Sequence, residues 1–394
     1  MTVPVDLHLY VHVPFCRYRC DYCDFYTRTT VPPWRQSEIL RATVDQTGEL
    51  LERWGSPSLS TLYIGGGTPS ALHPDALDQL LRLINTRTPT AETTVELNPE
   101  DISRELLDRF EEAGVNRFSI GIQSFREHTL RRIGRHTSIE ATRRGLEILA
   151  DRWRPGTKTD HGLFLRWNAD LIAGIPGGDP ADTVLDLEEI LSFGPDHLSV
   201  YELGVEDNTV LGRARRRGLL LPRDSDSLAE ELDAVRATLL DRGFLHYEVS
   251  NFAHPGAESR HNLGYWLMEP HLGVGPAAVG TLPEPTLRRF TNTREFSRYL
   301  HDPDRGLREE SLSPGDFLRE LLMMGLRTDR GVDRARVQKL AGRPLSDLLA
   351  NTLRRWKIAL PGSGESGAFV LSPENRQLLD RFLRDAFHEL DPES

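Results

Sequence analysis

Short apolar runs alternate along the first half of the chain with longer segments in which apolar residues return every three or four positions. The runs indicate strands at 7–13, 61–67, 93–99, 117–125, 167–176 and 197–203. The longer segments indicate helices at 36–54, 74–84, 103–113, 138–149 and 183–191, followed by one at 227–241. Strands that alternate with helices in this way predict βα units around a parallel sheet.

Several of these helices carry end signals. Pro74 suits the first position of a helix, and Gly114 and Gly194 suit the residues that follow a helix end. Thr137 and Glu140 form a capping-box pattern. These signals support the predicted helix boundaries.

Six βα units predict a partial, six-unit version of the β/α barrel, and an open doubly wound sheet is the alternative. A cysteine loop follows the first strand, GGGTP closes the second, and Glu96, Gln123 and Asp170 stand in or at the end of the next three. Tyr201 and Glu202 end the sixth. Because the carboxyl ends of strands carry the chemistry in β/α folds, these residues favour a barrel with its site at that edge.

Length and charge set limits on domain number and partners. A chain of 394 residues is longer than one core usually supports, so we expect a large domain with one or two smaller ones. The net charge of −11 argues against a nucleic-acid partner, whose binding site would be basic. No run approaches the roughly 20 apolar residues of a membrane span, and MTVPVDLHLYVHV lacks the features of a secretory signal.

All three cysteines, Cys16, Cys20 and Cys23, lie within eight positions. With no partners elsewhere they form no disulfide framework, which indicates a reducing cytoplasm. Ordinary iron–sulfur clusters take four thiolates, so three would leave one iron open to another ligand. A structural zinc site is the alternative, with His12 as a fourth ligand. His12 shares a strand face with the alternate residues before it, so packing against the core is the competing role.

The ordered motifs CRYRCDYC, YIGGGTPS, VELNPE, FSIGIQSF and ADLIAGIPG resemble those of the radical S-adenosylmethionine (SAM) enzymes. More narrowly, the chain is similar to the branch that contains oxygen-independent coproporphyrinogen III dehydrogenase and the heme chaperone HemW. The resemblance implies a partial (β/α)6 barrel over 1–285, with a family-specific extension at 245–280. It also implies a smaller, winged-helix-like helical domain of the HemN type over 286–394, so we expect the chain to turn helical after about residue 290.

The resemblance implies roles for individual residues. Cys16, Cys20 and Cys23 match the ligands of a [4Fe–4S] cluster whose open iron takes the amino and carboxylate groups of SAM. The positions that match contacts to this SAM are Tyr10, Gly66 and Glu96. The positions that match a second SAM site are Tyr22, Gly67, Thr68, Gln123, Arg135 and Asp170. Glycines at a strand edge allow close backbone approach, whereas Arg135 has a solvated helix-end charge as its alternative role.

Two departures separate this chain from the dehydrogenase. The dehydrogenase has a further cysteine where this chain has Phe25, and it has a longer N-terminal arm than the fifteen residues that precede Cys16 here. The segment SRHNLGYW carries the HNxxYW pattern of the chaperone branch. His261, Tyr265 and Trp266 are therefore candidate heme contacts, because aromatic rings supply flat apolar area and imidazole can ligate iron. A core histidine with aromatic packing is the alternative.

The sequence thus predicts a cytoplasmic heme chaperone of the radical SAM type. The resemblance implies that it binds a [4Fe–4S] cluster, SAM and heme, and that it passes heme to client apo-hemoproteins. It also suggests peripheral contact with membranes that hold heme-dependent complexes, and a homodimer. Enzyme activity is left open. One rival is a radical enzyme that cleaves SAM to a 5′-deoxyadenosyl radical and acts on coproporphyrinogen III or another substrate, and the other is a zinc-stabilised binding module.

Overall fold

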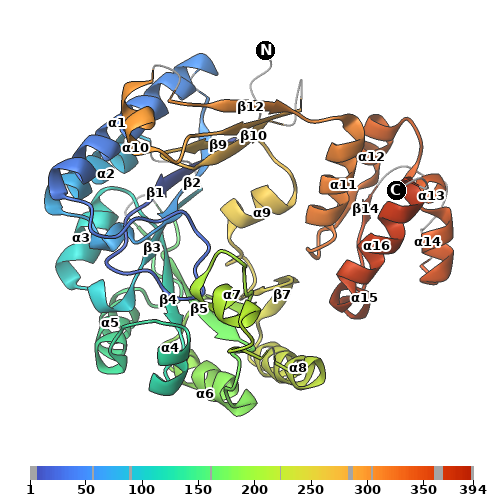
Figure 1. Cartoon of the computed structure of the whole chain (residues 1–394), viewed down its shortest axis with the longest axis horizontal. Helices are drawn as coiled ribbons and strands as arrows, with labels where there is room; N and C mark the ends of the chain where they lie inside the picture. Colours follow the sequence, from blue (N-terminus) through green and yellow to red (C-terminus); the bar gives the residue numbers. More distant parts are fainter. Residues whose placement is uncertain are drawn as a thin grey trace.

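The computed structural model describes residues 7–391 except 56, 88–90, 160–161, 222, 283–286, 303–304 and 359–366. Its centre is a run of six parallel strands that pair in sequence order. They are β1 (Leu7–Val13), β2 (Leu59–Gly66), β3 (Glu92–Leu97), β4 (Arg117–Gln123), β5 (Arg166–Ala173) and β6 (His197–Glu202). The strand order has no switch point between β1 and β6, and the connecting helices form one outer layer (Figure 1). The partial barrel is therefore confirmed, and the doubly wound alternative is wrong.

The outer layer contains the expected helices with adjusted ends. They are α1 (Pro33–Arg53), α2 (Pro74–Thr86), α3 (Arg104–Glu112), α5 (Ile139–Arg152), α6 (Pro180–Leu191) and α8 (Ser225–Asp241). Four short elements join them: η1 (Pro69–Ala71), η2 (Pro99–Asp101), α4 (Glu127–Arg132) and α7 (Val210–Arg216).

The helix-end signals were correct except for one. Pro74 begins α2, and Gly114 and Gly194 follow helix ends with φ of 102° and 73°. The capping box at Thr137 is wrong by one residue, because the Ser138 hydroxyl accepts the α5 cap bond from the Ala141 amide at 3.3 Å. Thr137 instead donates to the Glu100 carboxylate.

The sheet continues on both sides of the six strands. Beyond β1 lie β9 (His271–Val274), β10 (Val279–Leu282), β11 (Arg288–Thr291) and β12 (Arg308–Ser311), and beyond β6 lie β8 (Asn251–Ala253) and β7 (Leu245–Glu248). The expected turn to helix after residue 290 is therefore wrong as far as Ser311, although the short α10 (Phe296–His301) lies between β11 and β12. The predicted domain boundary at 285 falls between β10 and β11, which pair with each other.

The remaining chain forms a smaller, mainly helical unit at one side of the sheet (Figure 1). Its elements are α11 (Pro314–Gly325), β13 (Val332–Asp333), α12 (Arg334–Ala341), α13 (Leu345–Leu348), α14 (Ala350–Arg355), β14 (Ala368–Phe369), α15 (Pro373–Gln377) and α16 (Leu379–Leu390). Its apolar cluster runs from Phe317 to Ala386 and takes Met268 from the first part of the chain. The pattern GSGESGAFVLSPENRQLLDRFL predicts a turn, a short strand and a last helix. The strand β14 and the helix α16 are present, whereas most of the predicted turn lies outside the described residues. We propose that the boundary lies near Leu312.

Alternation along the strands separates the core from the site. In β3, Val95 packs into the apolar core, while Thr94 and Glu96 on either side of it line the barrel interior. Because successive strand side chains point to opposite faces, the apolar positions meet the outer helices and the polar positions meet one another inside. The fold thereby assembles a polar interior from strands that are distant in sequence.

Candidate functional site

A cavity of about 340 Å³ lies inside the partial barrel, next to the loop that follows β1. Most of the residues that the sequence singled out line it. They are Cys16, Cys20, Tyr22, Cys23, Gly66, Gly67, Thr68, Glu96, Gln123, Arg135 and Asp170. Parallel strands end at the same edge of a sheet, so these separate motifs meet in one place. Tyr10 is absent from the lining, and its hydroxyl lies 2.9 Å from His12 Nδ1 behind Gly66.

The three cysteines share the cavity wall without forming a site for a single ion. Burial raises the pKa of Cys16 to about 11, so its thiol keeps its proton until a metal displaces it. Within the described ranges, no three His, Cys, Asp or Glu side chains lie close enough to hold one metal ion. A cluster in which three irons each take one thiolate needs wider spacing than one tetrahedral zinc. The donor set therefore suits a cluster better than zinc.

His12 provides no fourth metal ligand. Its Nδ1 lies 2.9 Å from the Tyr10 hydroxyl, and its Nε2 donates to the Tyr26 carbonyl oxygen at 2.9 Å. Burial lowers the pKa of His12, which keeps the ring neutral with both nitrogens engaged. The competing prediction, a histidine packed against the core, describes it correctly.

The glycines after β2 are required by close packing of the chain on itself. Gly66 has a φ of 100°, and a Cβ there would lie 2.2 Å from the His12 ring. A Cβ on Gly67 would lie 2.5 Å from the carbonyl oxygens of Val13 and Phe15. Any larger residue would force the ends of β1 and β2 apart. Because the cysteine loop starts at the end of β1, these glycines fix its position.

Glu96 is a partly buried carboxylate without a cationic partner in the described part of the chain. It accepts hydrogen bonds from the Tyr63 hydroxyl at 2.8 Å and from the Gly66 amide at 3.0 Å. Burial raises its pKa to about 7 despite these two bonds. An amino or sulfonium cation would stabilise the ionised form, so Glu96 suits a cationic ligand such as SAM.

Gln123 and Arg135 are both directed at the cavity by the backbone around them. Gln123 ends β4 with a φ of 72°, at an irregularity in the pairing with β5. Such a conformation is uncommon outside glycine and often marks a functional site. Arg135 is only 7% exposed and donates to Asn98 Oδ1 at 3.1 Å and to the Gly121 carbonyl oxygen. The alternative role for Arg135, a solvated helix-end charge, is wrong.

Asp170 belongs to a polar group in the middle of the barrel that sequence reasoning only partly found. Its carboxylate accepts from Asn168 Nδ2 at 2.7 Å and from the Ser119 hydroxyl at 3.2 Å, and burial raises its pKa. Asn168 Oδ1 lies 2.6 Å from Nδ1 of His197. Ser119 and Asn168 precede Gln123 and Asp170 by even numbers of residues on the same strands. Period-two alternation from the predicted site residues would have located them.

The three candidate heme contacts lie on α9 (Arg260–Trp266), and none of their side chains lines the cavity. The His261 ring is 1% exposed and stacks on Tyr63 at 5.0 Å between centroids. The Tyr265 ring meets the His261 ring edge-on, with 4.8 Å between the centroids. The Arg327 guanidinium lies 4.9 Å from the Trp266 ring. His261 and Tyr265 therefore pack together, and Trp266 faces the helical unit. The alternative of aromatic core packing describes His261 in this conformation.

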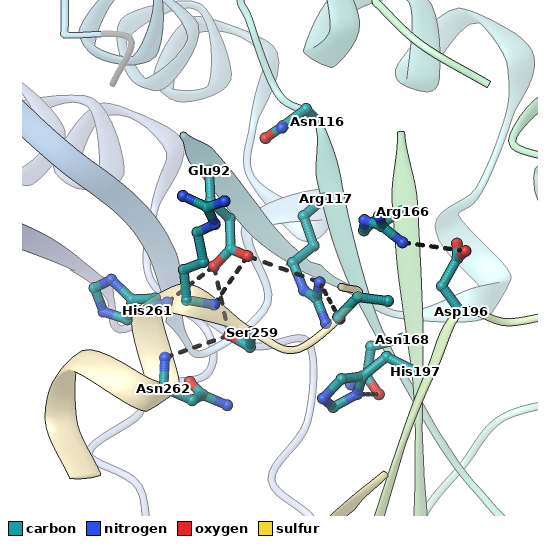
Figure 2. A network of polar contacts seen from close by, with 12 residues as sticks. Glu92, Asn116, Arg117, Arg166, Asn168, Asp196, His197, Ser259, His261 and Asn262 are labelled. Atoms are coloured by element: carbon teal, nitrogen blue, oxygen red, sulfur yellow. Dashed lines mark hydrogen bonds and ion pairs between the residues drawn. The ribbon is translucent and has the colours of Figure 1, made fainter. Parts of the chain in front are cut away.

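A buried network at the amino ends of the strands holds α9 (Figure 2). The Glu92 carboxylate accepts from the amides of Arg260 and His261 at 3.1 and 3.0 Å, and from the Ser259 hydroxyl at 3.4 Å. The Arg117 guanidinium lies 3.7 Å from the same carboxylate. At the other end of α9, Arg336 donates to the Leu267 and Met268 carbonyl oxygens. The helix is thus fixed at both ends.

Comparison with known proteins decides the family. The model of the radical SAM superfamily matches residues 10–175, and that of the HemN C-terminal domain matches 312–357. The "Heme chaperone HemW" of Lactococcus lactis is 32% identical over 358 residues, which cover 87% of this chain and 89% of the relative. That of Mycobacterium tuberculosis H37Rv is 39% identical over 74% of this chain and 73% of the relative.

The chain belongs to the heme chaperone HemW family. Membership of this family within the radical SAM superfamily implies a [4Fe–4S] cluster and SAM. The solved structure of coproporphyrinogen III oxidase (HemN) from Escherichia coli has the same fold, with a TM-score of 0.77 and 22% identity over 97% of this chain and 90% of that one. The described residues of this HemW family member include no helix long and apolar enough to span a membrane.

Proposed function

We propose that Cys16, Cys20 and Cys23 hold a [4Fe–4S] cluster and that SAM occupies the adjoining cavity. The observation that carries this proposal is the meeting of three cysteines, Glu96 and Asp170 in one cavity. When bound, the cluster supplies an electron and an open iron. Glu96 would pair with the cationic end of SAM, while Gln123 and Arg135 supply polar contacts farther along the wall. The remaining positions proposed to contact SAM are Tyr10, Tyr22, Gly66, Gly67, Thr68 and Asp170.

We further propose that the protein binds heme and passes it to client apo-hemoproteins in the cytoplasm. Support comes from the curated relatives named heme chaperone HemW and from the HNxxYW segment on α9. His261, Tyr265 and Trp266 are the proposed heme contacts. Because the His261 ring is buried against Tyr63, heme reaches its Nε2 only when the packing around that nitrogen opens. Contact with heme-dependent membrane complexes and self-association as a homodimer belong to the same proposal.

A radical enzyme is the second candidate, and the form of the cavity favours it. The lining extends from the cysteines past Glu96 to Ser119 and Asn168, so a substrate could approach SAM inside the barrel. Phe25, which stands where the dehydrogenase has a cysteine, lines the cavity and is 67% exposed. Its position at the mouth argues for a departure from dehydrogenase chemistry.

Heme titration and transfer test the proposed function. Anaerobically purified protein with its cluster is titrated with ferric heme, and the Soret band is followed during mixing with an apo-hemoprotein. We expect a shifted Soret band, transfer to the acceptor, and no protoporphyrinogen from coproporphyrinogen III in the presence of SAM and a reductant. His261→Gln should change the heme spectrum, whereas His254→Gln, which alters a ring stacked on Phe244, serves as the control. Turnover of coproporphyrinogen III would establish the enzyme instead.

A further inference from the structure

Four side chains behind the cavity wall form one chain of hydrogen bonds that ends at His261. The Glu269 carboxylate lies 2.8 Å from His8 Nε2, and His8 Nδ1 lies 2.8 Å from the Thr61 hydroxyl. The same hydroxyl lies 2.6 Å from His261 Nδ1. Gly264 allows α9 to approach His8 closely, because a Cβ at this position would lie 2.5 Å from His8 Nε2. The chain thus joins β1, β2, α9 and the segment that follows α9.

The far nitrogen of His261 identifies where its proton lies. A neutral imidazole has one N–H donor and one lone pair. A cationic ring would carry an N–H on both nitrogens. The Nε2 of His261 is buried and has no hydrogen-bond partner in the described part of the chain. Buried N–H groups without an acceptor are rarer than unpaired acceptors, so the proton belongs on Nδ1 and is donated to Thr61.

The rest of the chain follows from that assignment. The Thr61 hydroxyl has one proton, and because it accepts from His261 it donates to His8 Nδ1. His8 therefore carries its proton on Nε2 and donates it to Glu269. Every donor then has an acceptor. The reverse order would leave a buried N–H on His261 without an acceptor.

We propose that Glu269, His8 and Thr61 are positioning residues that keep His261 in its Nδ1–H tautomer, with the Nε2 lone pair free for the iron of heme. Histidines that bind metals usually donate their other N–H to a neighbouring group, which fixes the tautomer and the ring orientation. Stacking on Tyr63 adds a second constraint on the ring plane. The link to iron rests on the proposed heme function, whereas the tautomer is a property of the heme-free chain.

Nitrogen NMR of the heme-free protein tests the tautomer directly. In the protein labelled with ¹⁵N-histidine, long-range proton–nitrogen correlations distinguish a protonated from an unprotonated ring nitrogen, and His261→Gln identifies the signals. We expect Nδ1 of His261 and Nε2 of His8 to be protonated and the other two nitrogens to be bare. A protonated Nε2 on His261 would overturn the inference without any variant having to fold.

Variants of the relay test its link to heme. Thr61→Val removes the hydroxyl at nearly constant volume and should shift His261 toward the Nε2–H tautomer, while Thr61→Ser should preserve the wild-type signals. Glu269→Gln keeps an acceptor for His8 and Glu269→Leu removes it. Loss of the hydrogen-bond partner of a metal-binding histidine typically weakens metal binding about 10- to 100-fold. We therefore expect heme affinity to fall by this factor in Thr61→Val but not in Thr61→Ser.

The outcomes separate the inference from the proposed function. If wild-type His261 has a bare Nε2 but His261→Gln binds heme with an unchanged spectrum, the heme-ligand proposal fails and the tautomer assignment stands. If Thr61→Val retains both the tautomer and the heme affinity of the wild type, the positioning role of Thr61 is refuted. Circular dichroism of Thr61→Val beside Thr61→Ser shows whether any loss comes from unfolding.

Discussion

Two glutamates on β3 face the same barrel interior and have different roles. At the amino end of the strand, Glu92 accepts three hydrogen bonds from the start of α9 and lies beside Arg117. At the carboxyl end, Glu96 accepts two hydrogen bonds and has a pKa raised to about 7 by burial. The two residues are four positions apart and thus share a strand face.

The difference lies in how completely each carboxylate is satisfied. Glu92 and Arg117 neutralise each other where a helix must be held, and together they form part of the scaffold. Glu96 lacks a cation in the described part of the chain, so its charge is available to a ligand in the cavity. A partly buried charge without a cation is therefore the mark of the site, and a buried charge paired with a cation is the mark of the framework.

The largest expected effect is at the carboxyl ends of the strands, where the cysteine loop borders the cavity. Cys20→Ala should abolish iron–sulfur cluster assembly, because two thiolates remain where three irons need one each. Iron and sulfide analysis after anaerobic reconstitution, expected to give about four of each in the wild type, measures the loss. The free energy of unfolding of the metal-free chain should change little, since Cys20 lines the cavity rather than the apolar core. Stoichiometric zinc in the wild type, bound by sulfur, would contradict the cluster.

The next effect is at the base of the barrel. Arg117→Leu should lower the free energy of unfolding by about 3–5 kcal/mol, because it leaves the Glu92 carboxylate buried without its cation. Denaturant unfolding measures the loss. The double variant Glu92→Gln with Arg117→Leu should recover part of it, since the amide retains an acceptor for α9 without a buried charge. A single variant as stable as the wild type would show that the pair is not part of the scaffold.

Glu96 should give a smaller effect that depends on pH. The pKa of its carboxyl is about 7 in the folded chain, compared with 4.5 as its ordinary value. The unfolded chain therefore releases this proton first, and stability is lost as the pH rises from about 4.5 through 7. This loss is on the order of 3 kcal/mol. The free energy of unfolding of the ligand-free protein is measured at pH 5 and pH 8. Glu96→Gln should remove this contribution to the difference between the two values.

The exposed Glu127→Gln is the matched control for that comparison. Glu96→Gln should also weaken SAM binding to the protein that carries its cluster, as measured by calorimetry, because the amide has no charge to offer a cation. Equal pH dependence in the Glu96→Gln variant and the wild type would contradict the proposed state of Glu96.

The smallest effect concerns the cap of α9. Ser259→Ala removes the hydroxyl that accepts from the Asn262 amide and donates to Glu92, and should cost about 1 kcal/mol in unfolding free energy. Ser103→Ala, which removes the cap of the outer helix α3, is the control. We expect only Ser259→Ala to change the heme spectrum, because only that cap holds the helix of His261. If the heme spectra of Ser259→Ala and Ser103→Ala are the same, the position of α9 does not control heme binding.

The amino-acid sequence by itself determined the βα alternation, the parallel order of six strands and most of the cavity lining. These follow from local periodicity and from motifs at strand ends, because parallel strands bring their carboxyl ends to one edge. Sequence reasoning missed β7 to β12, and β11 and β12 carry charged residues in place of the apolar runs that indicated the other strands.

Only the tertiary structure decided what each polar residue does in its place. Periodicity placed Glu96 on the third strand, and a motif singled out His261, but neither specified which atoms surround these residues. Arg117 beside Glu92, Tyr63 against His261, and the Thr61 hydroxyl between two histidines all come from other strands. The state of a buried charge or imidazole depends on those neighbours and on the loss of water, and both arise only when the chain has folded.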